Sequence, residues 1–264
     1  MSLTIHSIPA FEDNYIWLLE SDHQAWVVDP GQAEPVLAQL AKLGLTLTGI
    51  LLTHHHYDHT DGVEKLLECY SKSKVYAGYL MQKPYITHRV KQGDHIQIAN
   101  TQLSVLETPG HTLDHIAFYN DQVLFCGDTL FTGGCGRVFE GSAQQMTDSL
   151  LKLRALPDSL SVYCGHEYTL SNMNFALRAE PDNLQIAQRL SQVREKRKIH
   201  QACVPSKLKE EKLTNPFLRF DLEPLATELA KRNQTQAKLT SSDLFAICRA
   251  WKDQLDKTGE LDAF

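Results

Sequence analysis

Four side chains that can bind a metal ion lie within six residues of one another, and this cluster constrains the chain more than any other feature. His54, His56, Asp58 and His59 follow directly on the apolar run Gly49–Thr53, which predicts a buried strand. Imidazole and carboxylate groups together suit borderline cations such as zinc, at about 2.0–2.2 Å. If the chain turns where the strand ends, the four groups can surround a cation. The sequence therefore predicts a metal site at this point.

Three more candidate ligands each follow a predicted strand. They are His111 after Leu103–Thr108, Asp128 after Val123–Cys126 and His166 after Ser161–Cys164. A glycine directly precedes each of them, and glycine lets the backbone turn sharply and present the next side chain at the edge of a sheet. A single His or Asp after a strand is more often a cap or a hydrogen-bond partner. Together with the first cluster, the three predict a larger shared site.

The periodicity of the apolar residues divides the chain in two. In the first part, further strands are expected at Tyr15–Glu20, Ala25–Asp29, Lys74–Ala77 and His115–Tyr119, and helices at Glu34–Leu43, Asp61–Tyr70 and Ala143–Leu156, with Asp61 as a helix cap. In the second part, helices are expected at Glu167–Ala179, Asn183–His200, Pro224–Lys231 and Ser241–Leu255. We expect a sheet-containing domain over residues 1–170 and an α-helical domain over residues 171–264. Residues 205–219 show no clear pattern.

The net charge of −6 argues against a surface that binds nucleic acid as a whole, because such surfaces are usually basic. The segment Arg189–Arg219 departs from this average, with nine Lys or Arg residues against three Glu. One interpretation is a solvated face of a helix. The other is a rim that attracts an anionic substrate.

The cysteines and the N-terminus favour a cytoplasmic protein. The six cysteines form no Cys-x-x-Cys pair and their scatter does not resemble a disulfide framework. The first residues, MSLTIHSIPAFEDNY, lack a basic start followed by an apolar run. No stretch approaches the roughly 20 apolar residues of a membrane span. We expect a cytoplasmic monomer without a membrane or nucleic-acid partner.

Several longer stretches carry a resemblance to a known family. They are PAFEDNYIW at Pro9–Trp17, VDPG at Val28–Gly31 and GDTLFTGGCGR at Gly127–Arg137, besides the ligand segments. With them the chain resembles the metallo-β-lactamase superfamily and, within it, the glyoxalase II family of hydroxyacylglutathione hydrolases. The resemblance implies an α+β fold, an αββα sandwich followed by an α-helical domain. The periodicity agrees with this fold but could not by itself supply the sandwich.

The resemblance also implies a centre with two divalent metal ions, zinc or, with the same kind of ligand set, iron or manganese. His54, His56 and His111 would hold the first ion, Asp58, His59 and His166 the second, and Asp128 would bridge both. A hydroxide between the ions would attack the thioester of a glutathione conjugate such as S-D-lactoylglutathione, in methylglyoxal detoxification. Asp58 and Asp128 would also orient that hydroxide as catalytic residues.

Two further residues bear on such a centre. His55 is expected to face away from the metal ions. Asp29 either orients a metal-bound imidazole or only forms an Asp-Pro-Gly turn.

A glutathione thioester carries two carboxylates and needs cationic residues to bind it. Arg249 and Lys252 are three residues apart, on one face of the predicted C-terminal helix. The resemblance assigns them, together with Arg137, Phe139 and Tyr168, to substrate binding. Without it, an ordinary exposed helix face would be the favoured explanation of the basic pair.

Three positions depart from the family pattern. Asp61 and Asp114 stand where glycine is usual, and Asp tolerates a positive φ at some cost. Phe139 lacks the hydroxyl that Tyr provides in some members. These departures bear on affinity and loop geometry rather than on the metal ligands.

Other functions remain open on the sequence alone. Within the superfamily the alternatives are a broader thioesterase, a persulfide dioxygenase with a single iron, a β-lactamase, which would carry an export signal, and a nuclease, which would be more basic. Outside it, the alternative is a non-catalytic, metal-dependent binding protein that uses the basic segment Arg189–Arg219.

Overall fold

The computed structural model describes residues 3–233 and 238–261, and two mixed sheets form its frame. The first sheet has the order β1 (Thr4–Ala10), β2 (Asn14–Ser21), β3 (Gln24–Val28), β4 (Thr46–Leu52), β5 (Lys74–Gly78) and β6 (His88–Val90). The strands β3, β4, β5 and β6 run parallel to one another. Their carboxyl ends therefore lie at one edge of the sheet, where the predicted ligand cluster follows β4.

The second sheet brings three more strand ends together. Its order is β14 (Ser206–Lys207), β13 (Ser161–Cys164), β10 (Val123–Gly127), β9 (Ile116–Tyr119), β8 (Thr101–Glu107) and β7 (His95–Ile98). Because β10 is parallel to β13, and β9 is antiparallel to both β10 and β8, the strands β8, β10 and β13 point the same way. A small hairpin of β11 (Leu130–Phe131) and β12 (Gly134–Cys135) follows β10.

The two faces of the first sheet are buried against different layers. In β2, Ile16 and Leu18 belong to the apolar cluster beneath the helices α1 (Ala33–Leu43) and α3 (Val63–Cys69). Trp17 and Leu19, which alternate with them, belong to the core shared with the second sheet. The helix α4 (Ala143–Arg154) adds Met146, Leu150 and Leu153 to that core. The α+β fold, an αββα sandwich with a helical C-terminal region, is therefore as predicted.

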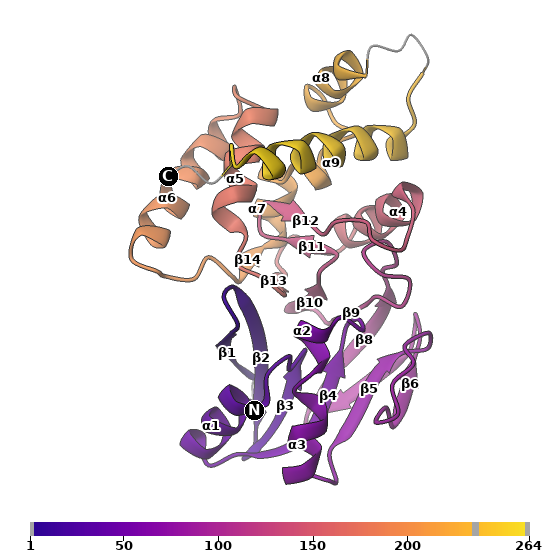
Figure 1. The fold of residues 1–264 in the computed structure, drawn as a ribbon, viewed down its shortest axis with the longest axis vertical. Helices are drawn as coiled ribbons and strands as arrows, with labels where there is room; N and C mark the ends of the chain where they lie inside the picture. The colour runs from indigo at the N-terminus through magenta and orange to yellow at the C-terminus, as the bar shows by residue number, and fades with distance from the viewer. Residues whose placement is uncertain (1–2, 234–237, 262–264) are drawn as a thin grey trace.

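The chain after the last ligand segment is mostly helical and covers one end of the sandwich (Figure 1). Its elements besides β14 are α5 (Thr169–Ala179), α6 (Leu184–Lys198), α7 (Leu208–Thr214), the 3₁₀ helix η1 (Pro216–Leu218), α8 (Leu225–Arg232) and α9 (Ser241–Thr258). Residues 205–219, for which the sequence showed no pattern, thus contain a strand and two short helices. None of the helices described combines the length and the apolar character that crossing a bilayer requires.

The expectation that Asp61 caps a helix start was wrong, and neither aspartate that replaces a usual glycine has a positive φ. Asp61 does not cap a helix start: it ends the short helix α2 (Tyr57–Thr60), and Gly62 precedes the first residue of α3. Asp61 has an ordinary right-handed φ of −67°, and Asp114 is not among the residues with positive φ. Neither position needs glycine for its backbone conformation.

The basic segment Arg189–Arg219 begins and ends in buried ion pairs. The guanidinium of Arg189 is buried against the carboxylate of Glu211. Arg219 donates to both oxygens of Glu180, at 2.7 and 2.8 Å. At these two ends neither earlier interpretation, a solvated face or a substrate rim, was right. The six cysteines, all within the described residues, are free.

Candidate metal centre

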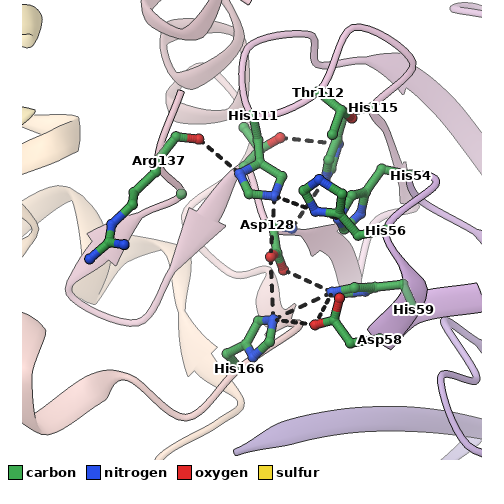
Figure 2. A network of polar contacts seen from close by, with 12 residues as sticks. His54, His56, Asp58, His59, His111, Thr112, His115, Asp128, Arg137 and His166 are labelled. Atoms are coloured by element: carbon green, nitrogen blue, oxygen red, sulfur yellow. Dashed lines mark hydrogen bonds and ion pairs between the residues drawn. The ribbon is translucent and has the colours of Figure 1, made fainter. Parts of the chain in front are cut away.

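Strands from both sheets end at the site, and backbone hydrogen bonds join the sheets there. Ile116 N–H donates to the carbonyl of Thr53 at 2.8 Å, and Tyr15 N–H donates to the carbonyl of Gly165 at 2.8 Å. The segments after β4, β8, β10 and β13 therefore meet. They carry the seven predicted metal ligands, and all seven converge in Figure 2.

Three imidazoles form the first group. The Nδ1 atom of His56 lies 3.1 Å from Nε2 of His54 and 3.0 Å from Nε2 of His111. Three nitrogens bound to one tetrahedral zinc would lie roughly 3.3 Å apart, given Zn–N distances of about 2.0–2.1 Å. The spacing of this group therefore fits a single cation.

The second group consists of Asp58, His59 and His166. The Nε2 atoms of His59 and His166 are 3.4 Å apart, and each lies within 3.5 Å of Oδ2 of Asp58. Asn14 donates to the same Asp58 oxygen at 2.9 Å and holds the carboxylate in place. This group offers two nitrogens and one oxygen to a second cation.

Asp128 lies between the two groups (Figure 2). Its Oδ2 atom is 3.5 Å from Nε2 of His111 and 3.3 Å from Nε2 of His166. Its Oδ1 atom is buried, accepts no hydrogen bond within the described structure and lies 3.4 Å from Nε2 of His59. A buried carboxylate oxygen without a hydrogen bond is costly. The donor set and this oxygen therefore fit divalent cations, with Asp128 in reach of both.

The second nitrogen of each of three rings contacts a fixed acceptor. Asp29 Oδ2 lies 3.0 Å from Nδ1 of His59, Asp13 Oδ1 lies 2.8 Å from Nδ1 of His166, and the carbonyl of Arg137 lies 2.8 Å from Nδ1 of His111. Such contacts fix the ring orientation and direct Nε2 into the site. Figure 2 shows that the guanidinium of Arg137 points away from the cluster.

Asp29 combines both roles considered for it. It has a positive φ of 53° in its Asp-Pro-Gly turn. Its carboxylate also accepts from the Thr53 backbone N–H at 2.8 Å and from the Thr53 hydroxyl at 2.6 Å, besides contacting His59. The turn is therefore the means by which this carboxylate reaches the metal-binding segment.

The two groups differ in their electrostatics. Burial lowers the pKa of His54 well below 6.5, and it also lowers those of His56 and His111. These rings are neutral near pH 7, so their lone pairs are available. Burial would lower the pKa of His59 as well, but Asp128 and Asp29 raise it to about 10. The second group therefore attracts positive charge.

Two glycines before ligands have different physical reasons. Gly127 has a positive φ of 46°, which sharply turns the chain before Asp128. Gly165 has no positive φ and instead makes room, because a Cβ there would lie 2.4 Å from Oδ1 of Asp128. The expected sharp turn thus does not explain Gly165.

A cavity of about 650 Å³ opens onto the cluster. All five residues predicted to bind substrate line it, together with five of the predicted ligands: Arg137, Phe139, Tyr168, Arg249 and Lys252, with His56, Asp58, His111, Asp128 and His166. Tyr168 stacks on His166 with the ring centroids 4.8 Å apart. The alternative of an ordinary exposed helix face was wrong for the basic pair, since Arg249 and Lys252 are only 6% and 5% exposed.

Sequence reasoning missed several residues of the site. Asp13 and Asn14 lie in the resemblance stretch Pro9–Trp17, which was the only available signal, and their contacts with His166 and Asp58 could not be derived from it. His115 accepts the backbone N–H of Asp128 at 3.1 Å. Asp256 lines the cavity and had no signal beyond its helical spacing from Lys252.

His55 lies outside both groups. Its Nδ1 atom is 3.0 Å from Asp114 and its Nε2 atom is 3.4 Å from Glu140. Asp114 also accepts from the hydroxyl of Thr112 at 2.7 Å. The aspartate that replaces the usual glycine therefore connects two of the segments that carry ligands.

Comparisons with known proteins show the family to which the chain belongs. A family model described as the metallo-beta-lactamase superfamily matches residues 10–166, and one described as the hydroxyacylglutathione hydrolase C-terminus matches residues 167–255. A hydroxyacylglutathione hydrolase of Hydrogenovibrio crunogenus is 48% identical over 267 residues, covering 99% of this chain and 98% of the relative.

Solved structures show the same fold. The crystal structure of ETHE1 from Myxococcus xanthus has a TM-score of 0.65 and 27% identity, and the match covers 95% of this chain and 99% of that one. The structure of TTHA1623 in a di-iron-bound form has a TM-score of 0.51 and 27% identity, covering 62% of this chain and 91% of that one.

Proposed function

Because the chain belongs to the hydroxyacylglutathione hydrolase family of the metallo-β-lactamase superfamily, we propose that it hydrolyses S-(2-hydroxyacyl)glutathione thioesters to glutathione and a 2-hydroxy acid. The lactoyl thioester, S-D-lactoylglutathione, would be its substrate in methylglyoxal detoxification. The observation that carries the proposal is a single cavity lined by two kinds of residue. Asp128, between two trios of candidate metal ligands, lines it, and so do the buried cations Arg249 and Lys252.

Two metal ions are part of the proposal. His54, His56 and His111 would hold one, Asp58, His59 and His166 the other, and Asp128 would bridge them. Two bound divalent cations would supply a bridging hydroxide near neutral pH and polarise the carbonyl of the thioester. The relative solved in a di-iron-bound form supports a dinuclear centre, and zinc, iron and manganese all suit these donors.

The chain's own residues would position the reactants. Asn14 holds Asp58, and His115 holds the backbone of Asp128, so both carboxylates keep fixed orientations. Tyr168 and Phe139 line the cavity beside the ligands and would contact the substrate. A thiol leaving group has a pKa near ~8.5 and leaves without protonation, whereas an amine needs an acid. This favours a thioester over an amide.

The proposed activity is tested by chelation. We expect the metal-loaded enzyme to hydrolyse S-D-lactoylglutathione, and we expect turnover to fall at least about 100-fold after the metals are removed, because the nucleophile depends on them. Hydrolysis is followed by loss of thioester absorbance, with metal content measured on the same samples. Readdition of zinc should restore the rate. Turnover that survives complete metal removal, or no turnover with two metals bound, would contradict the proposal.

A second prediction concerns Asp29, whose carboxylate contacts His59. Asp29→Asn keeps the shape and tolerates the positive φ, but it turns an acceptor into a donor opposite the ring nitrogen. We expect the affinity for one of the two metal ions to fall about 10- to 100-fold. Competition of the apoprotein with a chromophoric chelator for zinc measures this.

Asp22→Asn is the matched control for Asp29→Asn. Asp22 also has a positive φ, of 48°, but it is exposed and lies in the turn between β2 and β3. We expect it to leave both affinities unchanged. Equal affinities in the Asp29 variant and the control would show that the carboxylate does not orient His59 toward a metal ion.

A further inference from the structure

A carboxylate of the chain itself contacts the cations that line the cavity. Asp256 lies in the last turns of α9 and lines the cavity beside Arg249 and Lys252. The ammonium of Lys252 donates to both of its oxygens, at 2.8 and 3.0 Å. Its Oδ2 atom also lies 3.5 Å from Nη2 of Arg249 and 3.7 Å from Nη2 of Arg137. One carboxylate therefore contacts all three cations of the cavity.

Few donors of these cations remain free for a ligand. Lys252 has three N–H donors, and Asp256 accepts from it with both oxygens. Arg249 donates through Nη1 to the carbonyl of Cys135 at 3.0 Å and through Nε to Asp253 at 3.1 Å. A carboxylate entering the cavity therefore meets donors that already have an anionic partner.

We propose that Asp256 is a specificity-determining residue that competes with a substrate carboxylate for Arg249 and Lys252 and so weakens substrate binding. The inference rests on the proposed function, because that function supplies the anionic substrate. Glutathione carries two carboxylates and one ammonium group near neutral pH. The net charge of the three cations together with Asp253 and Asp256 is +1. The substrate must therefore displace Asp256 or share its partners.

The position of Asp256 in its helix supports a role toward a ligand rather than in folding. A carboxylate in the last turn of a helix faces the negative end of the helix dipole. In a helix, an ion pair between residues four apart is also weaker when the Lys precedes the acid, as Lys252 precedes Asp256, than in the reverse order. Asp256 thus contributes little to the stability of α9, and a neutral amide of the same shape should be tolerated there.

The opposite role is a counterion that holds the cations in position. Burial and the nearby Arg249 lower the pKa of Lys252, and the contacts with Asp256 oppose this. If that role prevailed, removing the carboxylate would weaken substrate binding instead of strengthening it. The two roles therefore predict opposite changes in KM.

The test compares the metal-loaded enzyme with its Asp256→Asn variant. We expect KM for S-D-lactoylglutathione to fall about three- to tenfold, with kcat within about twofold, because removing the carboxylate frees donors of two buried cations for charge-assisted hydrogen bonds to the substrate. Calorimetry should show the same ratio in the Kd of glutathione, which reports binding without turnover. Asp256→Ser should change KM in the same direction, which guards against an effect of the amide itself.

Asp243→Asn is the matched control. It removes the same charge from the same helix, but Asp243 is exposed in the first turn of α9, where it accepts from Thr240, and it does not line the cavity. We expect its KM to change less than twofold. An unchanged or higher KM in the Asp256 variants, or an equal fall in the Asp243 variant, would overturn the inference while the hydrolase activity stands. A wild-type enzyme that hydrolyses no thioester would refute the proposed function and, with it, this inference.

Discussion

Asp128→Ala should lower kcat for S-D-lactoylglutathione by about 10²- to 10³-fold, the range seen when one group that stabilises charge in a transition state is removed. The carboxylate oxygens of Asp128 lie within 3.5 Å of imidazole nitrogens of both trios. Its loss should also leave the protein with fewer than two bound metal ions. Steady-state kinetics and elemental analysis of the same preparation measure both effects.

Two controls make the result for Asp128 interpretable. Asp121→Ala removes an exposed aspartate before β10 and should leave rate and metal content unchanged. Asp128→Asn keeps the volume and separates the loss of charge from the loss of packing; its rate should still fall strongly. Near-normal turnover with two metal ions in either Asp128 variant would disprove a bridging role for this residue.

The candidate metal ligands could be named from the sequence because several of them follow a predicted strand. A strand that is buried on both faces gives a continuous apolar run, and its end is marked by a polar residue. The strands predicted before His54, Asp128 and His166 therefore indicated both the elements and the candidate ligands. Their convergence could not be derived, since it depends on which strands pair and in which direction. Only the resemblance to a family supplied that.

The surroundings of the site were harder to predict for a different reason. Asp13 and Asn14 lie at a turn between two strands, where no periodicity distinguishes a functional side chain from a solvated one. For Arg249 and Lys252, helical spacing indicates a shared face, but it does not say whether another segment covers that face. The carbonyl of Cys135, more than a hundred residues earlier, contacts Arg249.

Residues 205–219 show how charge can mislead. The sequence LKEEKLT of α7 is polar enough to suggest an exposed loop, yet Glu211 is fully buried. Its oxygens accept from Arg189, from Asn215 at 3.1 Å and from the backbone N–H of Gly133 at 2.8 Å. A buried charge with complete partners gives no apolar signal, so a pattern of hydrophobicity cannot detect it.

Glu211→Ala should lower the free energy of unfolding by about 3–5 kcal/mol, because it leaves the buried guanidinium of Arg189 without its carboxylate. The N–H of Gly133 would lose its acceptor as well, and the neighbouring residues Phe131 and Cys135 line the cavity. We therefore expect KM to rise together with the loss of stability. Urea unfolding followed by circular dichroism gives the first quantity, and steady-state kinetics gives the second.

Glu210→Ala is the matched control for Glu211, because it removes the same group one residue earlier. The side chain of Glu210 is 45% exposed and lies 3.5 Å from the same guanidinium. An exposed pair of this kind contributes about 0–1 kcal/mol, so the control should unfold almost like the wild type. Replacing both partners, as Arg189→Met with Glu211→Leu, should recover much of the loss, because no unpaired charge stays buried. If Glu211→Ala costs no more than Glu210→Ala, the buried pair does not hold this part of the fold together.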